Sequence, residues 1–133
     1  MSAFYGKGLE KFLNGDIDWT NDDIKVSAVD TGTYTVDTAT HEFRTDLTGV
    51  VATSGNLASK TATLGVADAA DVVLSGVTGD SIEAIVIWKD TGSNATSPLI
   101  AYIDSASSGL PVTPNGGTIT IAWDNGANKI FKL

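Results

Sequence analysis

The sequence has no cysteine, a single histidine and no long hydrophobic run, and each absence excludes a class of protein or site. Without cysteine, the chain forms neither disulfides nor a thiolate nucleophile nor a thiolate metal site. With His41 as the only histidine, a metal site with two histidines is also excluded. No apolar run approaches the roughly 20 residues that span a membrane, and the start, MSAFYGKGLEKFLNG, lacks the basic and apolar regions of a secretory signal. We therefore expect a soluble protein that is made in a cytoplasm and does not contact a membrane.

Basic residues are scarce as well. The chain has 8 Lys and Arg residues against 16 Asp and Glu residues, which gives a net charge of -8, and the basic residues are scattered along the sequence. Nucleic-acid binding is disfavoured, because phosphate contacts need a positive patch. Glycine, threonine, serine and alanine are plentiful, and hydrophobic residues reach 42%. This composition is typical of short strands joined by tight turns.

The N-terminal segment predicts one short amphipathic helix, over about residues 2–13. Phe4, Leu9, Phe12 and Leu13 recur at near-helical spacing, and a glycine follows as a stop signal. The glycines at positions 6 and 8 each weaken a helix by roughly 1 kcal/mol relative to alanine. We therefore expect this helix to depend on docking against another surface.

From about residue 24 onward the pattern is one of strands and turns. Short apolar segments, the first of them IKVSAV, recur every 8 to 15 residues or so, with Gly, Asn, Asp or Ser between them. The sequence therefore predicts a single, mainly β domain over residues 1–133. Its expected architecture is an antiparallel β-sandwich or a jelly-roll-like barrel.

The segment 81–90, SIEAIVIWKD, is apolar on both faces of its expected strand. Val86 and Trp88 point to one side, while Ile85 and Ile87 point to the other. A strand with one solvated face would alternate more cleanly. Either this strand is central and covered on both sides, or one side meets another subunit.

The motif Asp-Thr-Gly occurs twice, beginning at Asp30 and at Asp90, and it is also the signature around an aspartic-protease carboxylate. That chemistry needs two carboxylates sharing a proton in buried loops, whereas both copies here run into Thr, Ser and Asn. Turns explain them better. No serine stands in a nucleophile-elbow sequence, so His41 has no partner for a Ser-His-Asp triad. Beside Glu42 and Arg44, a surface or capping role is favoured for this histidine. We expect no catalytic residue and no enzyme activity.

The acidic segment with Asp16, Asp18, Asp22 and Asp23 is the best candidate for a metal site, because oxygen ligands at close spacing suit calcium. The spacing does not fit an EF-hand loop. Turn and helix-capping roles explain these residues equally well, so both interpretations remain open. No cofactor is predicted.

Three segments together resemble a family of small tailed-phage virion proteins: FYGKGLEKFLNGDIDWTNDDIKVSAVDTG, GVADAADVVLSGVTGDSIEAIVIWKDTG and LPVTPNGGTITIAWDNGANKIFKL. Such proteins are usually encoded among head-assembly genes, and related ones act as capsid cement or decoration proteins. The resemblance runs along nearly the whole chain. It implies a structural protein on the capsid surface of a virion, bound to the major capsid protein and to itself as a homodimer or homotrimer.

An alternative within the virion is a tail or neck module that joins virion parts or recognises a host-surface glycan. Exposed tryptophans in a groove, at Trp19, Trp88 or Trp123, would favour glycan binding. For assembly, the candidate contact residues lie on the N-terminal helix, the two central apolar strands and the C-terminal strand: Phe4, Leu9, Phe12, Ile85, Ile87, Trp88, Tyr102, Ile130, Phe131 and Leu133.

Overall fold

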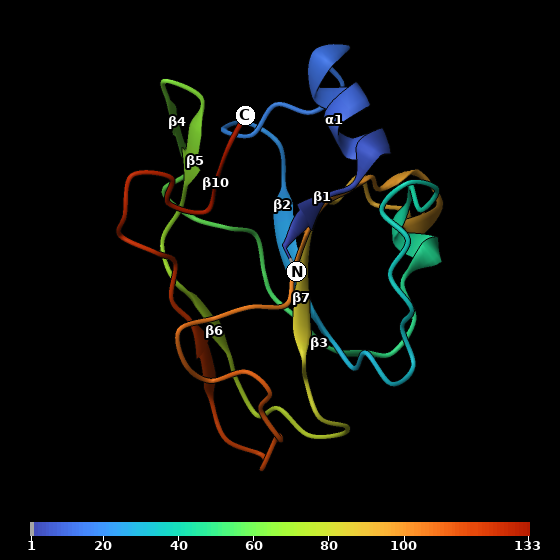
Figure 1. Cartoon of the computed structure of the whole chain (residues 1–133), viewed down its shortest axis with the longest axis vertical. Helices are drawn as coiled ribbons and strands as arrows, with labels where there is room; N and C mark the ends of the chain where they lie inside the picture. Colours follow the sequence, from blue (N-terminus) through green and yellow to red (C-terminus); the bar gives the residue numbers. More distant parts are fainter. Residues whose placement is uncertain (1) are drawn as a thin grey trace.

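A computed structural model describes residues 2–133 and confirms the mainly β, antiparallel architecture with one α-helix (Figure 1). The elements follow one another as β1 (Ala3–Phe4), α1 (Gly6–Leu13), β2 (Ile24–Val29), η1 (Arg44–Asp46), β3 (Val50–Thr53), β4 (Thr61–Thr63), β5 (Val66–Asp68), β6 (Val72–Leu74), β7 (Ala84–Lys89), η2 (Asn94–Thr96), β8 (Leu99–Ile103), β9 (Ile119–Ile121) and β10 (Phe131–Lys132). The two η elements are single turns of 3-10 helix.

The main sheet has five strands in the order β1-β8-β7-β2-β3, and every neighbouring pair in it is antiparallel. Its middle strand is β7, and the pair β2 and β7 runs in register from Ile24 opposite Lys89 to Val29 opposite Ala84. β-branched and aromatic residues dominate both strands, as expected for a buried sheet. The first strand predicted from the sequence, IKVSAV, is therefore an inner strand that lies directly beside the middle strand β7.

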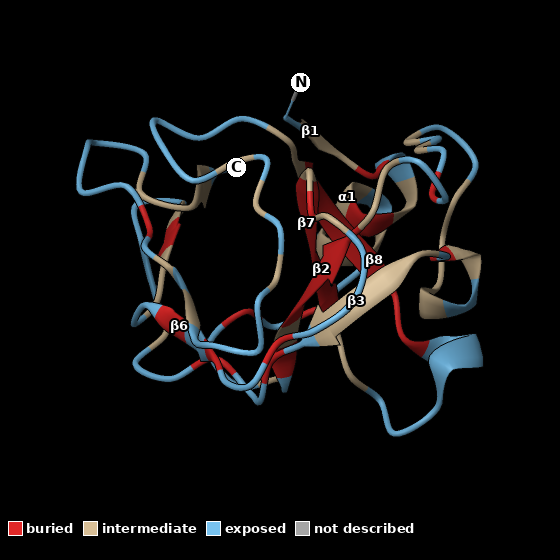
Figure 2. Cartoon of the chain, turned by 90° about the horizontal axis from the view of Figure 1, so that it is seen from below, coloured by how far each residue is buried: buried red, intermediate tan, exposed pale blue. Residues whose placement is uncertain are grey.

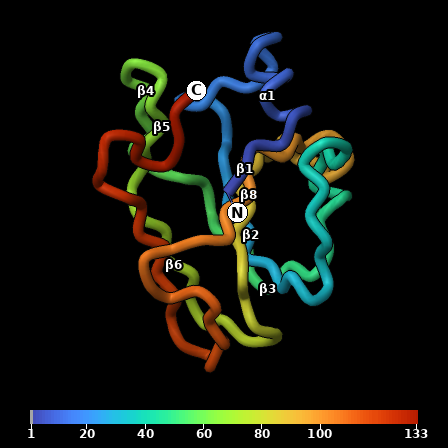
Figure 3. The backbone as a smooth tube through the Cα atoms, viewed as in Figure 1, coloured from blue at the N-terminus to red at the C-terminus, as the bar shows by residue number. Residues whose placement is uncertain are grey.

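A second layer is built from two smaller sheets, in the orders β10-β5-β4 and β6-β9. β5 and β6 follow each other along the chain, and β10 and β9 run antiparallel beside them, with Phe131 opposite Ala67 and Thr120 opposite Val73. This layer stands beside the main sheet in Figures 1 and 3, on the opposite side from residues 31–49. The arrangement is sandwich-like, and the sheets do not close into a barrel.

Two hydrophobic clusters cover the two faces of the main sheet. Ile85 and Ile87 belong to the cluster shared with the second layer, whereas Val86 and Trp88 belong to the cluster shared with Tyr5 and the 31–49 segment. The buried residues therefore concentrate on β2, β7 and β8 (Figure 2). Of the two interpretations of segment 81–90, the structure shows the first: the strand is central and covered on both sides by its own chain.

Helix α1 begins at Gly6 rather than near residue 2. The reason is that Ala3 and Phe4 pair with Tyr102 and Ala101 as an edge strand of the main sheet. The helix docks on β8, as its weak intrinsic propensity led us to expect. Its Gly8 lies so close that an added Cβ would stand 2.3 Å from the carbonyl oxygen of Leu99. Among residues 2–133, no helix is long and apolar enough to cross a membrane.

Candidate functional site: an apolar face at one end of the molecule

Three exposed leucines belong to the end of α1, the β4–β5 turn and the chain after β10, which lie at the same end of the molecule (Figures 1 and 3). The exposed fractions are 89% for Leu13, 90% for Leu64 and 56% for Leu133. Large aliphatic side chains usually bury most of their surface, so exposed leucines at one end of the molecule are a candidate site for interaction. Leu133 also lines a groove, whose other walls include Phe12 and Gly65, the chain neighbours of Leu13 and Leu64. We call the three leucines together with this groove the leucine face.

The groove has a volume of about 380 Å³ and aromatic walls. Phe131 lines the groove and makes edge-to-face contacts with three other rings, with centroid distances of 5.0 Å to Phe4, 6.2 Å to Phe12 and 5.2 Å to Trp19. Gly15 and Gly65 also line the groove. An apolar pocket with rigid aromatic walls, open to solvent, is the kind of site in which one inserted side chain supplies much of the binding energy.

One carboxylate, that of Asp18, lies at the groove wall. Hydrogen bonds from Asn21 and Thr20 lower the pKa of this group below its ordinary value, so Asp18 is ionised at neutral pH. The neighbouring Asp16 is exposed. The groove is thus apolar inside and acidic along the edge formed by the loop after α1.

Of the ten candidate contact residues, Phe12, Phe131 and Leu133 line the groove, and Phe4 packs behind Phe131. Leu9 and Ile130 are half-buried elsewhere. The other four, Ile85, Ile87, Trp88 and Tyr102, are at most 7% exposed. They are core residues of β7 and β8 rather than contact residues, because both faces of these strands are covered within the chain. Leu13 and Leu64 were not among the candidates.

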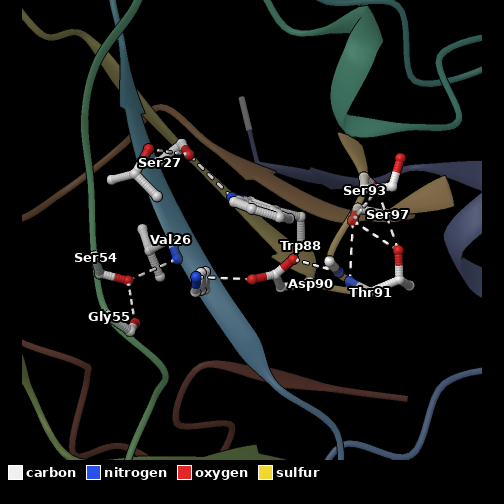
Figure 4. Close-up of polar contacts among 12 residues, drawn as sticks. Val26, Ser27, Ser54, Gly55, Trp88, Asp90, Thr91, Ser93 and Ser97 are labelled. Carbon is white, nitrogen blue, oxygen red and sulfur yellow. Dashed lines mark hydrogen bonds and ion pairs between the residues drawn. The ribbon is translucent and has the colours of Figure 1, made fainter. Parts of the chain in front are cut away.

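The two Asp-Thr-Gly motifs lie at opposite ends of the central strand pair, since Asp30 follows β2 and Asp90 follows its antiparallel partner β7. Each carboxylate accepts the N–H of the glycine two residues later, at 2.8 Å from Gly32 and 2.9 Å from Gly92. Asp90 also pairs with Lys25 at 2.7 Å, which lowers the pKa of Asp90. These carboxylates cannot share a proton. They stabilise turns, as Figure 4 shows around Asp90 and Thr91.

His41 takes part in a chain of hydrogen-bonded side chains that joins the 31–49 segment to Tyr5. Its Nδ1 accepts the backbone N–H of Asp37 at 3.4 Å, so the hydroxyl of Tyr34, 2.8 Å away, donates to the same nitrogen. The hydroxyl of Tyr5 in turn lies 2.8 Å from that of Tyr34. Burial raises the pKa of both phenols. The histidine thus terminates a structural network.

The acidic segment after α1 is closed by its own hydrogen bonds. Asp22 accepts the N–H of Asp18 at 2.7 Å and pairs with Lys89 at 3.0 Å, while Asp18 accepts from Asn21 and Thr20. Residues 2–133 contain no group of three or more His, Asp or Glu side chains placed to hold a metal ion. These contacts are the turn role that stood as one alternative to calcium, and none of the four carboxylates caps a helix.

The three tryptophans are buried, with exposed fractions of 5% for Trp19, 4% for Trp88 and 9% for Trp123. Each indole N–H donates inside the fold, to the carbonyl of Asp68, to Ser27 Oγ (Figure 4) and to the carbonyl of Ala70, respectively. Their rings are therefore unavailable as a platform for sugar rings.

A larger hollow of about 930 Å³ opens between the main sheet and the β6–β9 layer. Its walls are aliphatic, with Ile82 and Ile85 on one side and Leu74 and Ile119 on the other, and serines of the 105–108 segment lie at its edge. These wall residues are buried or half-buried, unlike the protruding leucines. The hollow thus lies between the two layers and opens to solvent beside the exposed 105–108 segment.

No protein-family model matches the chain, and the comparison with curated proteins finds no match. The resemblance to phage virion proteins therefore remains a prediction. Fold and site define a β-rich protein with two covered sheet faces and an apolar groove with exposed leucines at one end.

Proposed function

We propose that the chain is a structural virion protein of a tailed phage, a cement or decoration protein that binds the major capsid protein on the head shell and stabilises it. The observation that carries this proposal is the leucine face, a compact apolar surface on a strongly acidic chain. The candidate groups for chemistry, Asp30, Asp90 and His41, are engaged in turns and in a buried network instead.

A cement protein needs a stable β scaffold and an apolar surface through which copies assemble around the symmetry axes of a shell. Small contacts suffice for this role, because a copy held at one site makes its next contact effectively intramolecular. The net charge of -8 keeps single copies soluble before they assemble.

The tail or neck alternative divides into two cases. A module that joins virion parts would use the same leucine face, so copy number separates it from cement. A glycan-binding module is disfavoured by the burial of all three tryptophans, which leaves their rings without access to a sugar.

The test uses purified head shells that lack the protein. Added protein is expected to raise the melting temperature of the shells and to saturate at a fixed ratio to the major capsid protein, because a ligand that binds only the assembled state stabilises it. Counting copies in virions by quantitative mass spectrometry provides the independent control. Unchanged shell melting at saturating protein would refute the cement role, and a few copies per particle would favour the tail or neck.

A further inference from the structure

We propose that the hollow between the main sheet and the β6–β9 layer binds a saturated fatty acid, with the hydrocarbon chain between the layers and the carboxylate at the ammonium of Lys129. This inference goes beyond the assembly role proposed above and does not depend on it. Three observations carry it: the size and walls of the hollow, the polar groups at its edge, and the charge of Lys129.

The hollow has the size and the walls of a site for an apolar ligand. Its volume of about 930 Å³ lies within the range of roughly 300–1,000 Å³ that is typical of small-molecule sites. Aliphatic surface that is left in contact with water gains by burial against another apolar group. Six aliphatic side chains of the walls are only half-buried in the fold: Ile103, Leu110, Val112, Ile119, Ile121 and Ile130.

The walls suit a hydrocarbon chain better than a segment of polypeptide. A polypeptide brings an N–H and a C=O group at almost every residue, and each of these groups needs a hydrogen-bond partner when it is buried. The side chains of Leu74, Ile82, Ile85 and Ile119, which form the two sides of the hollow, offer no such partner. A saturated chain has no polar group to satisfy, so it can be buried there without this cost.

Most of the polar residues that line the hollow belong to two segments, 105–108 and 124–129. Much of both segments is exposed, so a charged head group placed beside them stays in contact with water. Among residues 2–133, Asp124 is the only carboxylate that lines the hollow, and it accepts the N–H of Gly126 at 3.0 Å in a turn of its own loop. The other acidic residues of the chain lie outside the hollow, and solvent ions screen charges beyond about 8 Å at physiological ionic strength.

Lys129 is the group that favours a carboxylate over an uncharged head. Its ammonium lies 3.4 Å from the backbone carbonyl oxygen of Asn125, another residue that lines the hollow. Within the part of the chain that the structure describes, this ammonium takes part in no ion pair. A hydrogen bond between an ammonium and a carboxylate is roughly twice as strong as one between neutral groups. A fatty acid would therefore supply the counter-charge that the chain itself does not.

The backbone at Lys129 is unusual as well. Its φ is 46°, a left-handed conformation that is uncommon for residues other than glycine. Strained positions of this kind concentrate at ligand sites, where the surrounding structure fixes a side chain in one place. This conformation therefore agrees with a role of Lys129 in holding a ligand.

The experiment is isothermal titration calorimetry of the isolated chain with decanoate and, in parallel, with 1-decanol, which has the same hydrocarbon chain and an uncharged head. Both titrations are done at neutral pH and below the concentration at which decanoate forms micelles. Decanoate is expected to bind saturably and about tenfold or more tighter than 1-decanol, which corresponds to roughly 1.4 kcal/mol. Lys129→Gln should lower the affinity for decanoate to that for 1-decanol and leave the affinity for 1-decanol unchanged, because glutamine is uncharged.

Ile121→Phe tests the location, because the larger ring fills part of the hollow. It is expected to weaken binding of both ligands by about tenfold or more. Val73→Phe is the matched control, since it adds the same ring at a position that is 59% exposed, between two residues of β6 whose side chains are buried. It should bind both ligands like the wild type. The melting temperature of each variant shows whether it is folded, and Ile119→Phe takes the place of Ile121→Phe if the latter is not.

Three results would overturn the proposal. The first is the absence of saturable decanoate binding to the wild type. The second is equal affinity of the wild type for decanoate and 1-decanol, or undiminished decanoate binding by Lys129→Gln, since either would leave the ammonium without a role. The third is a folded filling variant that binds like the wild type, because the ligand would then lie outside the hollow. The cement role is tested on shells, so none of these results bears on it.

Discussion

Replacing Gly8 by alanine tests whether α1 is held in place by its close approach to β8. In an exposed helix this substitution stabilises by about 1 kcal/mol, because alanine has the higher helix propensity. Here the new Cβ would lie 2.3 Å from the carbonyl oxygen of Leu99 and 3.1 Å from the Cα of Ile100. Both contacts are with backbone, so a change of rotamer cannot relieve them. The helix would have to move away by about 1 Å to reach an ordinary contact distance.

Overpacking of this kind costs about 1–3 kcal/mol, and contact with rigid backbone places Gly8→Ala at the upper end. After the gain in helix propensity, we expect a net loss of about 2 kcal/mol in the free energy of unfolding. With a typical denaturant dependence for a small domain, the urea midpoint should fall by roughly 1 M. Equilibrium urea unfolding followed by tryptophan fluorescence measures this change.

Gly6→Ala is the matched control, because it lies in the same helix and its Cβ would meet only the carbonyl oxygen of Thr38, at 3.6 Å. That distance is an ordinary contact, so Gly6→Ala should be neutral or slightly stabilising. If Gly8→Ala were as stable as Gly6→Ala, the packing of α1 on β8 described above would be wrong.

Two further predictions concern buried and charged polar groups. Tyr34→Phe should cost about 1–3 kcal/mol in thermal or urea unfolding and more than Tyr5→Phe, because it leaves the fully buried hydroxyl of Tyr5 without its one partner. The carboxylate of Asp46 accepts the backbone N–H groups of Glu42 and Phe43 at 2.8 and 3.1 Å, and these hydrogen bonds lower the pKa of Asp46. The contribution of this carboxylate to the free energy of unfolding is therefore present above the unfolded-state pKa and is lost as the pH falls through the folded-state pKa. Asp46→Asn should therefore lower the urea midpoint at neutral pH, and its urea midpoint should fall less than that of the wild type when the pH is lowered. Parallel pH profiles of the urea midpoint for variant and wild type would contradict this.

Much of the fold could be predicted because its signals are local. The alternation of IKVSAV identified β2, and the two apolar faces of segment 81–90 allowed a central strand as one of two outcomes. The register of neighbouring strands decides between such outcomes, and it is set by long-range pairing such as that of Ile24 with Lys89. For the same reason, the sequence alone placed Ile87 and Trp88 at an interface although both are buried within the chain.

The start of the helix was misplaced for a related reason. Phe4 fits the helical spacing, but Ala3 and Phe4 complete the edge of the main sheet instead, and pairing with β8 overrides the local pattern. The signal for Leu64 was present in the sequence as Leu-Gly between two short β segments. Recognising it requires knowing that both residues have positive φ, and this follows from the pairing of β4 with β5.

Some residues that line the groove of the leucine face also pack in the core, and this determines which variants can test the function of the face. Phe131 contacts Phe4, Phe12 and Trp19, and so joins β10 to β1, to α1 and to the loop before β2. Truncating that ring would open a cavity as well as alter the groove, so lost assembly could not be separated from lost stability. Leu64 is 90% exposed and is not one of the rings that shape the groove, so its replacement changes the exposed surface while those rings stay in place.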